Sequence, residues 1–183
     1  MSYEQPIPHD TLRTIYSIVA PAAVSIVNEG HECDQQLMVF NVLGDGEPEL
    51  VTILPPRIIQ SLHASAAHKD VLFAFVRDIL QRRDADVVVH VTEAWGTFFS
   101  AGGVKSGLQR YEELKRAGVS LEHQPGRTES LIIMLHTREG TCSGMMPITG
   151  TPRRVKLAPL AVEQIGSRDF TGRISLNLEE RAA

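Results

Sequence analysis

The chain has 183 residues, of which 43% are hydrophobic and 22% charged, as is usual for a globular protein. These values exclude a disordered or fibrous chain and fit a single domain over residues 1–183. The formal net charge of −4 gives no general attraction for nucleic acid or anionic membranes, and two cysteines are too few for a disulfide scaffold. We therefore expect a cytoplasmic protein.

An apolar stretch near the N-terminus, residues 14–27, raises the question of a membrane segment. It is shorter than the roughly 20 residues needed to span a bilayer. Before it, Glu4 and Asp10 outnumber the single Arg13, whereas a signal peptide begins with basic residues. Apolar residues recur there at helical spacing, which predicts a buried amphipathic helix and no membrane partner.

The ends of this first helix carry recognisable signals. Asp10 is a candidate N-cap, and Gly30 is typical of a residue that ends a helix. Pro21 lies inside the apolar pattern, so we expect a kink near Ser17 or a split after Ala20.

Two β-like runs follow, at 36–43 and 49–54, and the turn sequence GDGEP between them predicts a hairpin. Pro56 suits the first turn of a helix, and amphipathic patterns cover 58–66 and 71–80. The sequence leaves open whether these patterns form two helices or one.

The second half of the chain predicts more strands. Residues 86–95 and 131–137 are apolar and β-branched, as in central strands. Further strands are expected over 142–149, 155–162 and 173–178, whereas residues 100–124 are expected to be a flexible insertion with a short helix over 108–117. The order predicts an α+β fold, in which two or three main helices pack on a mostly antiparallel or mixed sheet of about five to seven strands.

Two histidines, His90 and His136, each precede a glutamate by three residues on or just past a strand. Residues three apart on a strand point to opposite faces, so neither pair chelates a metal alone. We interpret both histidines as structural and expect no cofactor. The alternative is a metal site formed by both histidines with Glu93 or Glu129.

Other motifs are incomplete. The segment GGVKSG lacks the phosphate-binding pattern, and neither cysteine stands in a nucleophile signature. Arg153, Arg154 and Lys156 form a basic cluster, but the low aromatic content of 5% argues against a nucleic-acid partner. These motifs leave open whether the protein is an enzyme.

A strand end, Thr92-Glu93-Ala94-Trp95, and a later strand start, residues 125–129 with sequence PGRTE, stand on either side of the insertion. Together they resemble a group of small uncharacterised phage and bacterial proteins with an E-A-W strand end and a P-x-R-x-E strand start. The resemblance implies no known activity. It nominates Glu93, Trp95, Arg127 and Glu129 as a cluster, because antiparallel pairing brings a strand end and the next strand start to one edge.

Two interpretations of this cluster follow. In the first, an ion pair from Arg127 to Glu93 or Glu129 fixes strand register, and the protein is a non-enzymatic protein-binding or self-associating module of phage-related origin. That hypothesis predicts a homo-oligomer with an apolar face on the first helix or an exposed sheet edge. In the alternative, the cluster is the site of a small-molecule binding protein or hydrolase-like enzyme, with Trp95 as its floor and the insertion as its cover.

Overall fold

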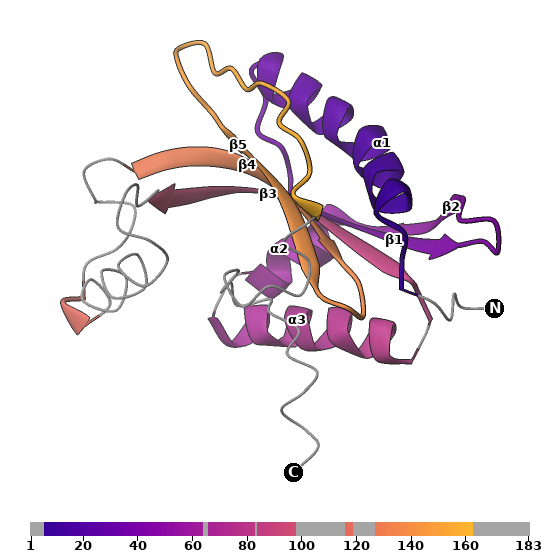
Figure 1. The fold of residues 1–183 in the computed structure, drawn as a ribbon. Helices are drawn as coiled ribbons and strands as arrows, with labels where there is room; N and C mark the ends of the chain where they lie inside the picture. The colour runs from indigo at the N-terminus through magenta and orange to yellow at the C-terminus, as the bar shows by residue number, and fades with distance from the viewer. Residues whose placement is uncertain (1–5, 64–65, 83, 98–115, 119–126, 163–183) are drawn as a thin grey trace.

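A computed structural model describes residues 6–63, 66–82, 84–97, 116–118 and 127–162. Within these residues, three helices and one antiparallel five-stranded sheet form the predicted α+β fold (Figure 1). The strand order is β2-β1-β3-β4-β5. The elements are α1 (His9–Asn28), β1 (Gln36–Val42), β2 (Pro48–Leu54), α2 (Pro56–His63), α3 (Ala66–Gln81), β3 (Val87–Thr97), β4 (Arg127–His136) and β5 (Thr141–Pro147).

Three sequence predictions lie wholly or mostly outside the described residues. They are the insertion at 100–124, of which only 116–118 are described, the helix within it, and the strand at 173–178. The predicted first hairpin is confirmed as β1 and β2, and the second as β4 and β5.

The hairpin of β1 and β2 contains one irregularity. Val39 pairs with Thr52 and the next residue, Phe40, pairs with Leu50, so Val51 is an extra residue in β2. A bulge of this kind changes which side chains share a face of the sheet. The bulge places Leu50 and Ile53 on the same face of the sheet as their cross-strand partners in β1, Phe40 and Met38.

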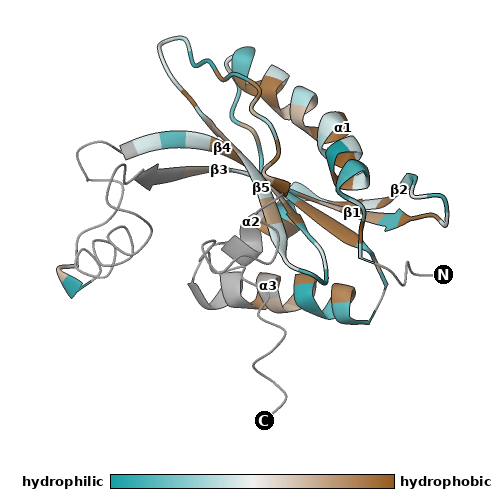
Figure 2. Cartoon of the chain, in the orientation of Figure 1, coloured by the Kyte–Doolittle hydropathy of each residue, from teal (hydrophilic) through white to brown (hydrophobic). Residues whose placement is uncertain are grey.

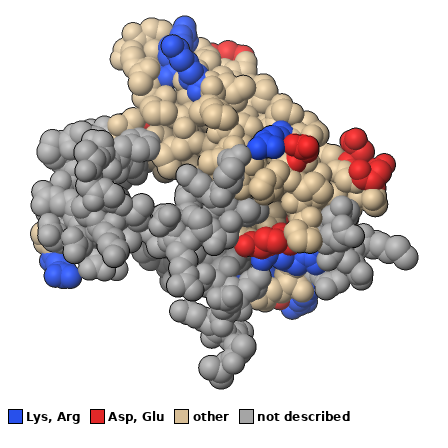
Figure 3. Space-filling model, in the orientation of Figure 1, with Lys and Arg blue, Asp and Glu red and all other residues tan. Residues whose placement is uncertain are grey.

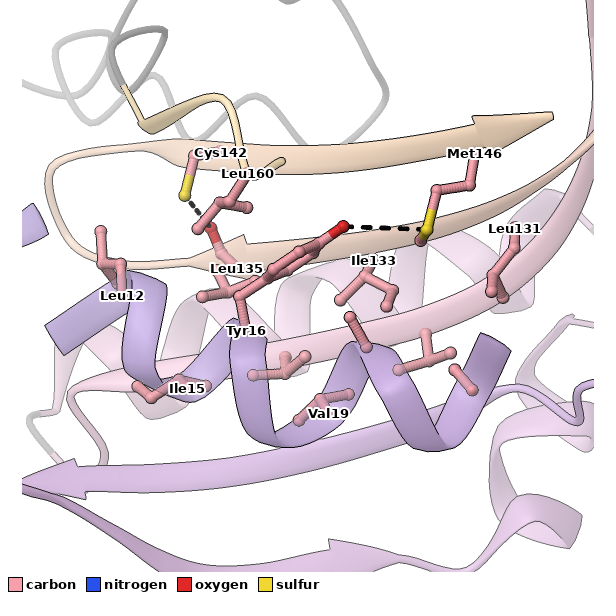
Figure 4. Close-up of a cluster of buried hydrophobic side chains, with 14 of the residues drawn as sticks. Leu12, Ile15, Tyr16, Val19, Leu131, Ile133, Leu135, Cys142, Met146 and Leu160 are labelled. Atoms are coloured by element: carbon pink, nitrogen blue, oxygen red, sulfur yellow. Dashed lines mark hydrogen bonds between the residues drawn. The ribbon is translucent and has the colours of Figure 1, made fainter. Parts of the chain in front are cut away.

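Helix α1 covers one face of the sheet through its apolar stripe (Figure 1). Figure 4 shows Tyr16 lying between the helix and the sheet, with its hydroxyl directed at the sulfur of Met146. Burying one such large apolar side chain is worth about 1.5–3 kcal/mol. The fully buried residues of this core include Leu12, Ile15, Val27, Leu131, Ile133 and Leu135.

The ends of α1 confirm one sequence signal and correct another. Gly30 ends the helix at a φ of 91°, and the amides of Gly30 and His31 donate to the carbonyls of Val27 and Ile26, which is a Schellman motif. Asp10 is not the N-cap: it lies inside the first turn and pairs with Arg13 at 3.0 Å.

Pro21 does not split α1, so the predicted break after Ala20 is wrong. A proline inside a helix costs about 3 kcal/mol because it removes one backbone hydrogen bond. The packing of Val19 and Ala23 on either side of Pro21 against the sheet offsets this cost.

Helices α2 and α3 cover the other face of the sheet (Figure 1). They are two separate helices, which answers the question left open by the sequence, and Pro56 is the first residue of α2 as predicted. Figure 2 shows hydrophobic residues along the strands between the two helical layers. The core on this side is formed by Leu37, Val39, Ile59, Leu72, Val76, Leu80, Ala85 and Val88.

The segment 155–162 is not the predicted strand. Pro159 interrupts its pattern, since proline has no amide hydrogen for a ladder. The segment instead runs beside β5, where the amide of Ala161 donates to the carbonyl of Ser143 at 3.1 Å and the Tyr16 hydroxyl donates to the carbonyl of Ala158 at 2.8 Å. Among the described helices, we find none with the length and hydrophobicity needed to span a bilayer.

Candidate functional site

A compact charged cluster lies at one end of β3 and β4. The guanidinium Nη2 of Arg153 lies 2.5 Å from Oε2 of Glu93 and 3.1 Å from Oε1 of Glu129. All three side chains are largely shielded from solvent. The hydrogen bond that Arg153 donates to the Glu93 carboxylate raises the pKa of Arg153, which keeps the guanidinium charged.

The backbone around this cluster holds it in place. The second carboxylate oxygen of Glu93 accepts a hydrogen bond of 2.7 Å from the amide of Cys33, and Nη1 of Arg153 donates to the carbonyl of His31. Asn28, at the end of α1, makes two hydrogen bonds with the backbone of Val155. The cluster therefore joins the end of α1, the sheet and the loop after β5.

The strand register brings the four residues of the predicted site to one end of the sheet. Trp95 pairs with Glu129 and Thr97 pairs with Arg127, so Glu93, Trp95, Arg127 and Glu129 belong to one face. The side chains of Trp95 and Arg127 lie outside the described residues. The cation that the structure assigns to both glutamates is Arg153.

Sequence reasoning missed Arg153 because it follows Glu93 by 60 residues and lies in a loop. Its neighbours Arg154 and Lys156 made it look like part of a surface basic cluster. The structure uses Arg154 differently as well, since its guanidinium donates to the carbonyl of Asn28 at the end of α1.

His90 and His136 share the face of the sheet that is covered by α2 and α3. His136 pairs with Val88 and His90 with Met134, so the two histidines are diagonal neighbours. Glu93 and Glu129 lie on the opposite face, because they occupy alternate positions on the same strands. The carboxylates considered for a metal site are therefore separated from both histidines by the sheet.

His136 has the properties of a structural residue. It is fully buried, and its Nδ1 lies 2.9 Å from the hydroxyl oxygen of Thr141. Burial, with a smaller contribution from His90, lowers the pKa of His136 to about 3, so the ring is neutral at pH 7. Within the described residues, no three His, Cys, Asp or Glu side chains gather as metal ligands would.

Both cysteines are buried. Burial, and then the negative charge of Glu93, raise the pKa of the Cys33 thiol to about 11. A nucleophilic cysteine needs the opposite shift, because the thiolate is the reactive form. Cys33 therefore lacks the properties of a nucleophile.

A groove of about 280 Å³ lies between α1 and the strands β1 and β2, close to Cys33 and Val91. Nearly all of its lining is aliphatic or aromatic, and two of the residues, Leu50 and Ile53, stand on either side of the bulge in β2. The lining includes Ile18, Ala22, Met38, Phe40, Leu50 and Ile53.

Three apolar residues that line this groove are also open to solvent: Ile18 is 57% exposed, and Leu50 and Ile53 of β2 are each 48% exposed. Val51, the bulge residue beside them in β2, is 50% exposed but does not line the groove. We call these four residues the α1–β2 surface. Strand β2 is also an edge of the sheet, and none of the other described strands lies beside the outer side of its backbone.

Charges are distributed unevenly over the face seen in Figure 3. Much of the described surface there has neither acidic nor basic side chains, whereas acidic side chains gather near the outer end of the β1–β2 hairpin. Large apolar patches on a monomer are uncommon and often mark an interaction site.

Comparisons of the chain with protein-family models, with curated proteins and with solved structures found no match.

Proposed function

We propose that this protein is a non-enzymatic module that binds a protein partner through the α1–β2 surface. The observation that carries the proposal is an apolar groove bordered by half-exposed aliphatic side chains and an open strand edge. An extended protein segment fits such a surface, since its backbone pairs with β2 and its alternate side chains enter the groove.

The free energy gained by burying apolar side chains can be compared with the cost of association. Completing the burial of one half-exposed aliphatic side chain contributes about 1 kcal/mol, so the four residues together contribute about 4 kcal/mol. Association costs at least as much in lost translational and rotational freedom. The side chains alone therefore give weak binding, and the backbone hydrogen bonds along β2 supply the remainder.

The charged cluster supports this proposal indirectly. Glu93 and Glu129 share Arg153 and form part of the connection between α1, the sheet and the loop after β5. A mutual ion pair of this kind offsets the cost of removing its charges from water. In the proposed account, the cluster positions α1 over the sheet and thereby shapes one end of the groove.

A selection from a displayed library of random peptides tests the proposal. We expect enrichment of peptides with alternating apolar residues on the wild-type protein and loss of their binding to Ile53→Glu. Val71→Glu is the matched control, because Val71 of α3 is 55% exposed and does not line the groove. Enriched peptides that bind Ile53→Glu as well as wild type would contradict the assignment of the surface.

A small-molecule site at the charged cluster is the second candidate. The convergence of Glu93, Trp95, Arg127 and Glu129 at one end of β3 and β4 favours it. A thermal-shift screen against nucleotides, metabolites and divalent metals, repeated with Glu93→Gln, separates the two functions. A shift that disappears in Glu93→Gln would support this candidate over protein binding.

A further inference from the structure

We propose that the occupant of the α1–β2 surface is a second copy of this chain, joined by antiparallel pairing of β2 with β2 of its partner. The inference rests on the proposed function and names its partner. The result is a two-fold symmetric dimer in which two five-stranded sheets form one continuous sheet.

The two edge strands of the described sheet, β5 and β2, differ in what lies beside them. At the β5 edge, the returning segment lies alongside the strand, and Ala161 donates a backbone hydrogen bond to Ser143. At the other edge, β2 pairs with β1 on one side only among the described strands, and three of its residues have half-exposed aliphatic side chains. An apolar edge that is left open in this way is suited to pairing with another strand.

The sequence of β2 is complementary to itself. Antiparallel pairing centred between Val51 and Thr52 places Leu50 of each copy opposite Ile53 of the other, on the face that carries α1. The four side chains then meet at the two-fold axis and close the open sides of both grooves. This match depends on the bulge at Val51, which puts Leu50 and Ile53 on one face.

The charge pattern also permits pairing of identical copies. Glu49 is the charged residue of β2, and it lies near the start of the strand. In the proposed register Glu49 is opposite Leu54 of the partner, so the two Glu49 residues lie at opposite ends of the paired β2 strands. No like charges face each other, although such repulsion commonly prevents self-association of edge strands.

The available area permits a weak dimer. Four half-exposed aliphatic side chains and the adjoining strand backbone present on the order of 400 Å², within the range of the largest patches on ordinary monomers. A two-fold interface buries this patch on both copies, about 800 Å² in total, which is within the range of weak and transient interfaces. We therefore expect a dimer of modest affinity.

Two features of β2 limit how many of its residues can pair with β2 of the second copy. Pro48 has no amide hydrogen to donate, but it is the first residue of the strand and lies outside the central register. The bulge interrupts regular backbone pairing at Val51. Pairing of two copies is therefore expected over a short central stretch, together with side-chain contact across the grooves.

Sedimentation velocity over a range of protein concentrations tests the proposal. We expect the mass to rise from that of the 20.2 kDa chain to twice that value as the concentration increases. Leu50→Glu should remain monomeric, because it brings two carboxylates to the apolar centre. Val71→Glu should dimerise like wild type. A wild-type protein that is monomeric up to millimolar concentration would overturn the proposal.

Cysteine cross-linking tests the register directly. In the proposed pairing, Val51 of each copy lies diagonally across from Val51 of the other on neighbouring strands about 5 Å apart, which is close enough for a disulfide. Val51→Cys should form a covalent dimer under oxidising conditions, whereas Val71→Cys should not. Both native cysteines are buried and give little background. Equal cross-linking of the two variants would contradict the assigned register.

These experiments separate the inference from the proposed function. If the chain is monomeric but binds selected peptides through Ile53, the surface recognises a different protein and the inference of a second copy is wrong. If peptides are not bound and Leu50→Glu leaves the mass of the wild-type assembly unchanged, both proposals are wrong.

Discussion

Arg153 shows how a single side chain can connect distant parts of this fold. It bridges Glu93 of β3 and Glu129 of β4, and it also binds the carbonyl of His31 beyond the end of α1. The proximity of Glu93 and Glu129 could be predicted from the sequence, because the two strands that carry them are recognisable from their local patterns of apolar residues and were expected to pair. It did not predict the cation, because no local pattern relates a loop arginine to a strand 60 residues earlier.

The first prediction concerns this bridge. Arg153→Gln should lower the free energy of unfolding by about 1–3 kcal/mol, because it leaves two shielded carboxylates without their cation. The measurement is urea denaturation at pH 7. Arg82→Gln is the control: Arg82 makes an exposed pair with Asp78 on α3, and its loss should cost less than about 0.5 kcal/mol. Equal losses in the two variants would show that the bridge contributes no more than a surface pair.

The second prediction concerns the pH dependence of stability. The pKa of His136 is about 3 in the folded protein and near 6.5 in the unfolded chain, so the unfolded state binds more protons between these values. This contribution to stability is complete above pH 6.5 and is lost as the pH falls towards 3. The loss between pH 7.5 and pH 5 should be about 2 kcal/mol.

Denaturation of wild type and His136→Gln at both pH values isolates this contribution. The variant should lose less stability on acidification than wild type, whereas His31→Gln, at an exposed position, should behave as wild type. The glutamine can retain a hydrogen bond to Thr141, which favours folding of the variant. An unchanged acid-induced loss in His136→Gln would contradict the assignment.

At the scale of elements, the close approach of α1 to β5 depends on Gly144. A Cβ atom at this position would overlap the hydroxyl and ring of Tyr16. The absence of that atom allows the tyrosine to lie across the strand and reach the carbonyl of Ala158. The sequence predicted both elements, but it did not predict this contact, because the tyrosine and the glycine are widely separated along the chain.

The third prediction follows from this contact. Gly144→Ala should destabilise the protein by about 1–3 kcal/mol or more, since overpacking forces α1 away from the sheet. Gly44→Ala is the control, because a Cβ atom there meets no atom within 4 Å and the φ is not positive. Thermal unfolding of both variants checks the prediction. If Gly144→Ala is as stable as Gly44→Ala, the helix packs less closely than described.

At the scale of the whole molecule, much of the architecture could be predicted from the sequence. Period-two and period-3.6 patterns, with Gly and Pro at the turns, indicated the helices, both hairpins and an α+β fold. The α1–β2 surface could not be predicted, because it depends on the strand order and on the bulge at Val51, which is a property of pairing between strands.

The proposed function is also a whole-molecule property. An apolar helix face and an apolar edge strand come together at one side of the sheet, while the opposite edge is lined by the segment before Val162. This asymmetry leaves one side of the molecule suited to strand pairing. The charged cluster and the contact between Tyr16 and Gly144 both fix α1 over the sheet, and so contribute to the shape of that side.

Hydrogen–deuterium exchange of the wild-type protein at low and high concentration tests the central claim most directly. The account predicts that exchange of the β2 amides, residues 49–54, slows as the concentration rises, with the amides of α3 unaffected. Leu50→Glu should show no such slowing. Exchange of the β2 amides at the same rate at all concentrations, or equal slowing in α3, would contradict the assignment of β2 as the binding edge.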